Sequence, residues 1–497
     1  MFGFPYGVAM TRLRNTQPLQ ELIVISDLEW HRILYTVVKE STGEADWIKA
    51  FGKCGHGPAE FFYPAGISID TTVYNGNKNE YTLYVADSRN SRIQILKYRV
   101  EREEMRRIGS LNYDFFLPVD VASVTKEDGN GCYIVVVDKD ANNITLIESK
   151  SDGSYHLLMK YGSLGNGPDK FSRPMGIEIT KAEDHGYFIY VADRENNRIV
   201  ALRFIPEENK IYFIKEYRIP GGGLTSVTAS QYYCVYAVES FTNKIYVFTH
   251  GLNELLYTYG DPQLLNRPIK AYIDWDRLGL TEKWTDTTGL QYFRIVPEIR
   301  ELKAEPDSFD ATEQDSIKIS FRVDETAAYL KMVIQGNNQS RTVFENVYYT
   351  PGRHFVYWDG KDDSGNLFLP GNYTIYVSSS NYTHHLATAQ IKVKGTRINS
   401  NYISGKWTKE KEPYVILRPD VAIGSGDSLI IEPGVKVMFL KNYQTKIWVY
   451  GKLKAVGTFE DSIFFLPYKK LWEITPQDTG YWKGINFFTS TIYFKIF

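Results

Sequence analysis

The most informative feature of this 497-residue sequence is a long stretch that occurs twice. The first copy consists of GHGPAEFFYPAGISID and LYVADSRNSRIQIL, and the second consists of GNGPDKFSRPMGIEIT and IYVADRENNRIVAL. The spacing from Gly57 to Pro64 and from Asp87 to Arg92 is the same in both copies. Self-similarity over several tens of residues is typical of stacked or radial units, each too small to bury a hydrophobic face alone.

Weaker copies of the same pattern share an acidic residue and an isoleucine six residues after it. The acids are Asp27, Asp87, Asp138, Asp193 and Glu239, and the fifth residues after them are Arg32, Arg92, Asn143, Arg198 and Lys244. An apolar run before each acid and an alternating run after it predict a β-hairpin. We expect acid and base to face each other as structural pairs, each worth about 1 kcal/mol or less where exposed.

A strand led by proline precedes most of these hairpins. The prolines are Pro5, Pro64, Pro118, Pro174 and Pro268, and a Gly-rich start at Gly221–Gly223 replaces the proline in the remaining unit. The last hairpin is reduced to LQYFRIV, at residues 290–296. We therefore predict an all-β fold that begins with six four-stranded units around an axis, a six-bladed β-propeller over residues 1–297.

The repeated residues resemble the NHL repeat family, whose units carry Gly-Pro-x-x-Phe, Pro-x-Gly-Ile and Tyr-Val-Ala-Asp-x-x-Asn-x-Arg-Ile segments. The second and fourth units of this chain match nearly every position, and the other units keep mainly the hydrophobic frame. The resemblance implies the propeller fold and leaves the activity open. Related propellers include RNA-binding proteins, and also lyases and lactonases that hold a metal ion on the axis.

A metal-dependent propeller enzyme needs inward-facing ligands at matching positions of several units. The eight histidines of this chain share no register within the repeat, and no nucleophile, phosphate-loop or zinc-protease motif is present. We predict no catalytic residues and favour a role without catalysis. A metal-dependent lyase or lactonase, or a polysaccharide lyase or hydrolase, is the alternative.

From about Val296 the repeat ends, and the segments SIKISFRV, YLKMVIQ, HFVYWDG and YTIYVSS predict a β-sandwich over residues 298–396. The segment PGRHFVYWDGKDDSGNLFLPGNYTIYV resembles the Ig-like domain of the flagellar hook-capping protein. Trp358 lies at the end of a predicted strand within this segment. We expect its indole to be a buried anchor of the sandwich core.

A turn in the same segment gathers oxygen ligands, and its candidate calcium ligands are Asp359, Asp362, Asp363 and Asn366. Their order departs from the EF-hand spacing, so a solvated polar turn is the favoured interpretation and no cofactor is predicted. Cys54, Cys132 and Cys234 are odd in number and far apart, and they form neither a disulfide framework nor a metal motif.

We expect a linker at residues 397–420 and a further domain at residues 421–497. Segments of this domain resemble the opening coils of secreted right-handed parallel β-helices, and they are Pro433–Phe439, Ile447–Thr458 and Trp482–Phe487. A β-helix buries its core by stacking coils, so the apolar end TIYFKIF predicts further coils. The N-terminus starts inside a repeat unit and shows no signal peptide, which predicts a chain cut at both ends.

Basic and acidic residues are balanced, at 57 and 59, and interleaved, so nucleic acid is an unfavoured partner. No stretch approaches the length of a membrane span. We expect a bacterial extracellular or cell-surface protein whose propeller rim binds a protein or a glycan, with its oligomeric state open. The long loops are the predicted contact sites, and they are Thr71–Tyr81, Tyr98–Ile108 and Ile205–Lys210.

Overall fold

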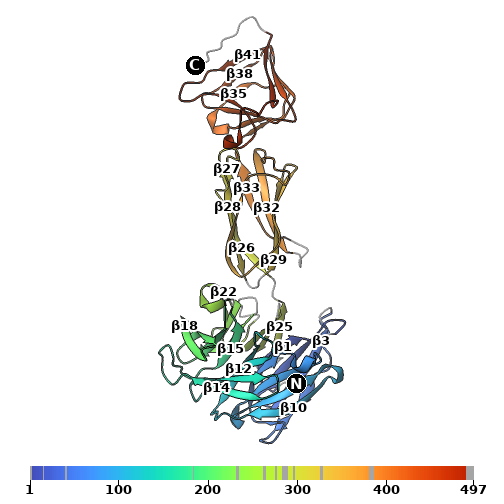
Figure 1. Cartoon of the computed structure of the whole chain (residues 1–497), viewed down its shortest axis with the longest axis vertical. Helices are drawn as coiled ribbons and strands as arrows, with labels where there is room; N and C mark the ends of the chain where they lie inside the picture. The colour runs from blue at the N-terminus through green and yellow to red at the C-terminus, as the bar shows by residue number, and fades with distance from the viewer. Residues whose placement is uncertain are drawn as a thin grey trace. The chain divides into compact units, whose positions relative to one another are not determined.

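The computed structural model describes all residues except 1–2, 15, 40–41, 183, 231–233, 261–264, 275–276, 283–288, 295–296, 325–327, 380–384 and 489–497. The described chain consists of β-strands joined by turns and short 3₁₀ segments (Figure 1). It divides into two compact units: residues 1–296 with 350–352, and residues 297–349 with 353–497.

The first unit contains six antiparallel sheets, which we call blades 1 to 6 in chain order. Blade 1 has β1 (Pro5–Arg12), β2 (Gln20–Asp27), β3 (Arg32–Lys39) and β4 (Lys49–Phe51). Blade 2 has β7 (Pro64–Asp70), β8 (Glu80–Asp87), β9 (Arg92–Arg99) and β10 (Glu104–Leu111). Blade 3 has β11 (Pro118–Thr125), β12 (Gly131–Asp138), β13 (Asn143–Lys150) and β14 (Tyr155–Tyr161). The short strands β5 (Lys53–Cys54) and β6 (Glu60–Phe61) pair between blades 1 and 2 in the chain.

The remaining blades follow the same order. Blade 4 has β15 (Gly176–Lys181), β16 (Tyr187–Asp193), β17 (Arg198–Ile205) and β18 (Lys210–Arg218). Blade 5 has β19 (Leu224–Ala229), β20 (Cys234–Glu239), β21 (Lys244–Thr249) and β22 (Leu255–Tyr259). Blade 6 has three strands among the described residues: β23 (Pro268–Asp274), β24 (Arg277–Glu282) and β25 (Leu290–Arg294). Four 3₁₀ segments lie in this unit: η1 (Tyr74–Gly76), η2 (Ser88–Asn90), η3 (Val100–Arg102) and η4 (His250–Leu252).

The first strand of each blade lies innermost, where it contacts the first strands of the two neighbouring blades. A hydrophobic cluster fills each of the six spaces between neighbouring blades. The cluster between blades 6 and 1 packs Val8 and Met10 against Tyr272, and Oγ1 of Thr281 donates to the carbonyl oxygen of Tyr6 at 2.6 Å. The predicted six-bladed propeller is therefore confirmed, and its ring closes by side-chain packing between blades 6 and 1.

The second unit begins with two facing sheets. The smaller sheet has β26 (Glu298–Glu305), β28 (Ile317–Asp324) and β31 (Gly352–Trp358). The larger sheet has β27 (Ser308–Phe309), β29 (Ala328–Gly336), β30 (Gln339–Tyr349), β32 (Gly371–Ser379) and β33 (His385–Val393). Trp358 is 1% exposed, and its ring stands nearly perpendicular to the rings of Phe309 and Phe368. Its Nε1 donates to the carbonyl oxygen of Lys361 at 3.0 Å, so the predicted core anchor is confirmed.

Three sheets of parallel strands follow, as in a parallel β-helix, in which each coil pairs with the next. The first sheet has β34 (Thr396–Ile398), β36 (Tyr414–Ile416), β39 (Lys436–Phe439) and β42 (Phe464–Pro467). The second has β35 (Gly405–Trp407), β38 (Ser428–Ile431) and β41 (Lys452–Ala455). The third has β37 (Asp420–Ile423), β40 (Thr445–Val449) and β43 (Trp482–Phe487). Two 3₁₀ segments accompany them: η5 (Lys409–Lys411) and η6 (Leu471–Glu473).

The predicted linker over residues 397–420 is wrong. Strands β34, β35 and β36 lie in this segment and pair in parallel with the following coils. Trp407 stacks on Tyr414 with ring centroids 4.6 Å apart, and both rings are buried. The segment therefore supplies the first coil and part of its hydrophobic filling. The end TIYFKIF lies outside the described residues.

The sandwich and the β-helix share one hydrophobic core. Val415 and Met438 of the coils belong to the same buried cluster as Trp358. The hydroxyl of Tyr468 donates to the carbonyl oxygen of Phe368 at 2.6 Å, within that junction. Apolar burial that spans both folds makes them cooperative, because neither can open without exposing part of the other's core.

Candidate functional site

In four hairpins the acidic residue holds the segment that leads into the inner strand of its own blade. The amide N–H of Phe62 donates to Oδ1 of Asp87, and that of Ser172 donates to Oδ1 of Asp193, both at 2.7 Å. Equivalent bonds are made by Asp27 and Asp138. Glu239 instead accepts the amides of Phe241 and Thr242 in its own turn. These carboxylates are buried and bind backbone amides and, in Asp87 and Asp193, the arginine of the same hairpin, so they serve the fold.

The basic residue of the hairpin binds the Gly-Pro-x-x-Phe segment. Nη2 of Arg92 donates to the carbonyl oxygens of Gly57 and Glu60, both at 2.8 Å. Its Nε donates to Oδ2 of Asp87 at 2.8 Å. The Gly-Pro-x-x-Phe segment and the hairpin of the repeated stretch thus bind each other, which explains why they occur together in the second and fourth units.

The pair of Arg198 is buried, so the value of about 1 kcal/mol or less expected for an exposed pair does not apply to it. The side chain of Arg198 is 1% exposed, and its Nε lies 2.8 Å from Oδ2 of the fully buried Asp193. The guanidinium also donates to the carbonyl oxygens of Asn166, Gly167 and Lys170. By contrast, the side chain of Arg32 at the same repeat position is 25% exposed. Because burial strengthens the penalty for an unpaired charge, these two arginines differ in their expected contribution to stability.

Two units replace the glycine of the Pro-x-Gly strand with a charged residue, Asp120 on β11 and Lys270 on β23. Glycine is required at the matching Gly66, where an added Cβ would lie 2.0 Å from Oδ1 of Asp120. Blades 3 and 6 are opposite in a ring of six, and Nζ of Lys270 donates to Oδ2 of Asp120. The side chains are 6% and 1% exposed. A buried ion pair therefore spans the propeller axis.

Glu178 on β15 lies close to this pair. Oγ1 of Thr228 and the amide of Ile179 each donate to its carboxyl group at 3.0 Å. Burial raises the pKa of Glu178 to about 7, and the positive charge of Lys270 opposes that shift. Burial also raises the pKa of Asp120, again against Lys270. The positive charge of Lys270 thus acts on two buried carboxyl groups, and an ammonium group repels a divalent cation.

The other candidate ligands do not gather. Among the described residues, no group of three or more His, Cys, Asp and Glu side chains is arranged to hold a metal ion. Burial lowers the pKa of His250 to about 4, so its ring is neutral at pH 7. His384 lies outside the described residues.

The candidate calcium ligands lie on a turn in which most of them bind backbone amides. Oδ1 of Asp362 accepts the amides of Ser364 and Asn366, both at 2.9 Å. Oδ1 of Asp359 accepts the amide of Lys361, and Oδ1 of Asp363 accepts that of Thr342. These bonds describe a polar turn that is held by its own side chains.

Two of the three predicted contact loops border one pocket between blades 2 and 3. Tyr74 from the loop Thr71–Tyr81 lines a cavity of about 330 Å³ together with Tyr155 and with Ile108, which the structure places on strand β10 and not in a loop. The hydroxyl of Tyr74 donates to Oδ2 of Asp70 at 2.7 Å. The loop Ile205–Lys210 joins β17 and β18 and does not line this pocket.

The opposite face of the propeller carries exposed aromatic side chains that sequence reasoning missed. It consists of the hairpin turns and the segments before each inner strand, because each leading residue pairs with the acid of its hairpin. On this turn face Trp30, Phe116 and Phe241 are 43%, 72% and 64% exposed. The guanidinium of Arg32 lies 4.4 Å from the ring centroid of Trp30, and that of Arg194 lies 5.6 Å from Phe241. The three aromatic residues occupy different positions in their repeat units, so no common spacing in the sequence could have identified them.

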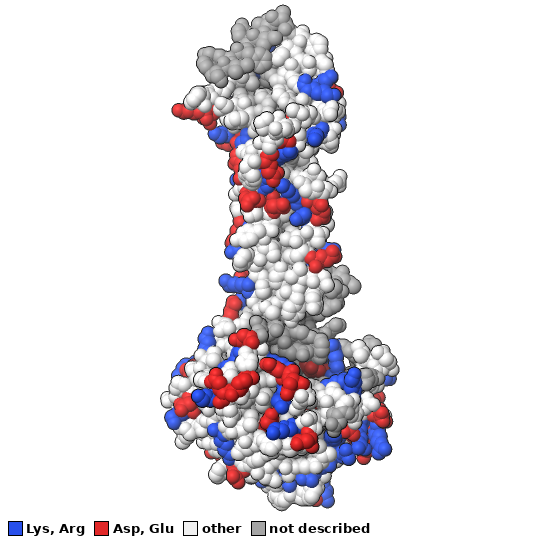
Figure 2. All heavy atoms as spheres, viewed as in Figure 1, with Lys and Arg blue, Asp and Glu red and all other residues white. Residues whose placement is uncertain are grey.

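Charges of both signs are mixed over the visible face of each unit in Figure 2. The described residues include no helix long and apolar enough to cross a bilayer. Neither a family model nor a curated protein sequence matches this chain.

Several solved structures are similar to it. A nidogen/laminin complex matches 54% of this chain and 84% of its own, with 14% identity and a TM-score of 0.37. A putative 6-phosphogluconolactonase from Bacteroides uniformis matches 65% and 95%, with 14% identity and a TM-score of 0.38. PorZ, a surface component of the type-IX secretion system of Porphyromonas gingivalis, matches 75% and 58%, with 10% identity and a TM-score of 0.38. Similarity at this level says nothing about what this chain binds.

Proposed function

We propose that this chain is an extracytoplasmic recognition protein whose propeller binds a protein partner through the turn face. The observation that carries the proposal is the exposure of Trp30, Phe116 and Phe241 on that face. Large exposed aromatic side chains accompanied by arginine are typical of the residues that dominate binding energy at protein interfaces. The extracytoplasmic location is supported by the resemblance of the downstream domains to secreted proteins.

The path of the chain supports the choice of this face. Strand β25 is antiparallel to β24, and its last residue, Arg294, pairs with Arg277, whereas Glu282 at the other end of β24 pairs with Pro268. The chain therefore leaves the propeller at the end of the blades away from the turn face.

Site-specific photocrosslinking tests the proposal. A photoreactive phenylalanine analogue is placed at Phe116 of the full chain, and a matched control carries it at Ile214 on the outer strand β18, which is 47% exposed. Exposure to the proteins of the source cell should yield a discrete crosslinked protein at Phe116, which Phe241→Ala weakens. Equal yields at both positions, or a product indifferent to Phe241→Ala, contradict the proposal.

A further inference from the structure

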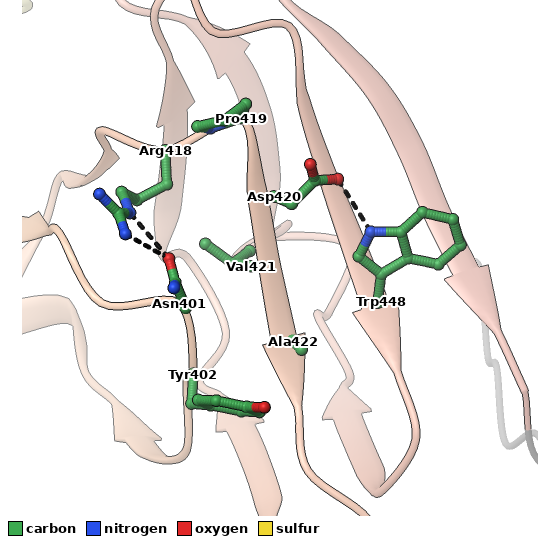
Figure 3. A pocket seen from close by; sticks show the side chains of 8 residues that line it. All are labelled: Asn401, Tyr402, Arg418, Pro419, Asp420, Val421, Ala422 and Trp448. Carbon is green, nitrogen blue, oxygen red and sulfur yellow. Dashed lines mark hydrogen bonds between the residues drawn. The ribbon is translucent and has the colours of Figure 1, made fainter.

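The third sheet of the β-helix carries a pocket of about 500 Å³ on its outer side (Figure 3). Its lining includes Tyr402, Arg418, Asp420, Ala422 and Trp448. Small-molecule sites range over roughly 300–1,000 Å³ and combine apolar surface with a few placed polar groups, and this pocket has both features.

Coil stacking explains why the hollow exists. Tyr402 pairs in parallel with Ala422, and Ala422 pairs with Trp448, so the three residues form one outward column across successive coils. Paired strands lie about 4.8 Å apart, which separates the backbones of Tyr402 and Trp448 by roughly 10 Å. Ala422, whose side chain is a single methyl group, lies between Tyr402 and Trp448 in this column and adds little bulk there (Figure 3).

The polar groups of the pocket are held in place. Nε1 of Trp448 donates to Oδ1 of Asp420 at 2.9 Å, which fixes the indole beside the hollow. Nε of Arg418 donates to Oδ1 of Asn401 at 2.9 Å, which orients the guanidinium. In the part of the chain that the structure describes, Oδ2 of Asp420 and Nη1 of Arg418 have no hydrogen-bond partner and are available to a ligand.

We propose that this pocket binds a pyranose unit of a glycan. A pyranose ring presents an apolar C–H face, which packs on an aromatic ring, and an edge of neighbouring hydroxyl groups. Those hydroxyls can donate to the carboxylate of Asp420 and accept from the guanidinium of Arg418. Because the column runs along the stacked coils, an extended glycan can continue past Trp448 toward Tyr450 and Phe488, whose rings stack with centroids 5.0 Å apart.

Titration calorimetry of the full chain with cellohexaose, chitohexaose and an oligogalacturonate tests this proposal. At least one of these should bind, and Trp448→Ala should weaken that binding about tenfold or more. Ala422→Tyr fills the hollow without removing a ligand-binding group, and it should abolish binding while the melting temperature stays unchanged. Trp472→Ala removes an exposed ring outside the pocket and the column, and it should leave the affinity within about threefold.

Two results overturn the proposal. One is the absence of binding by all three oligosaccharides at millimolar concentration. The other is binding that survives both Ala422→Tyr and Trp448→Ala. Neither result bears on the turn face of the propeller, because the crosslinking experiment there uses different residues in the other unit.

Discussion

Lys270→Met should destabilise the propeller by about 3–5 kcal/mol at pH 8, because it leaves Asp120 as a buried carboxylate without its cation. Asp120 is 1% exposed, and its Oδ2 also accepts the amide of Ile177 at 2.9 Å, so the carboxylate cannot turn toward water without breaking that bond. The cost should shrink at pH 5, since losing the ammonium makes protonation of Asp120 easier.

A double-mutant cycle isolates the pair. Asp120→Asn keeps an acceptor for the amide of Ile177, and the variant Asp120→Asn/Lys270→Met removes both charges. We expect the double variant to lose less stability than the two single variants together, with a coupling of about 2 kcal/mol. Hydrogen exchange of peptides from β11 and β23, followed by mass spectrometry across a urea series, reports the propeller within the full chain.

Two outcomes would refute the reasoning. Additivity within about 0.5 kcal/mol would show that the two groups do not interact strongly. A loss below about 1 kcal/mol for Lys270→Met would show that water reaches the axis and screens the charges.

Three further predictions concern stability. Burial raises the pKa of Glu178 from 4.5 to about 7, so ionisation of this group weakens the fold as the pH rises through that window. In urea unfolding, Glu178→Gln should raise the free energy of unfolding by at most about 3 kcal/mol at pH 8 and by little at pH 4. Arg198→Ala should lower the stability of the propeller by about 3–5 kcal/mol and Arg32→Ala by about 1 kcal/mol. Equal losses of stability for the two variants, measured by hydrogen exchange, would contradict the role of burial. Trp358→Ala should cost the second unit about 3–5 kcal/mol of stability. In calorimetry it should lower the unfolding temperature of the sandwich and the β-helix together and leave that of the propeller unchanged.

The propeller could be predicted because its signal is local and repeated. Each of the five hairpins places an acid and a turn within a few residues, four of them add a base, and the five copies fix the period. The burial of Arg198 could not be predicted from the same pattern. It depends on a segment near Gly167 that folds back over the guanidinium, and the unit of Arg32 lacks that segment in the sequence.

The parts that the sequence did not reveal depend on register between distant residues. Asp120 and Lys270 are separated by 150 positions, and their pairing is visible only when the glycine positions of the repeat are aligned around the ring. The first coil of the β-helix could not be predicted because β34, β35 and β36 have three residues each, which is too short to show an alternation of apolar and polar residues. The pocket lined by Tyr402 and Trp448 could not be predicted either, since Tyr402 belongs to that first coil.

Comparison of the repeat units with one another separates positions that serve the fold from positions that are free to serve recognition. The acid, the Gly-Pro segment and the base bind each other in the second and fourth units, so a change there costs stability. Trp30, Phe116 and Phe241 lie between these positions, and their side chains are largely exposed. Large exposed aromatic residues gain little for a folded monomer, because their apolar area stays in water. Their exposure on the turn face is better explained by a partner that buries them, and this makes the turn face the first place to test.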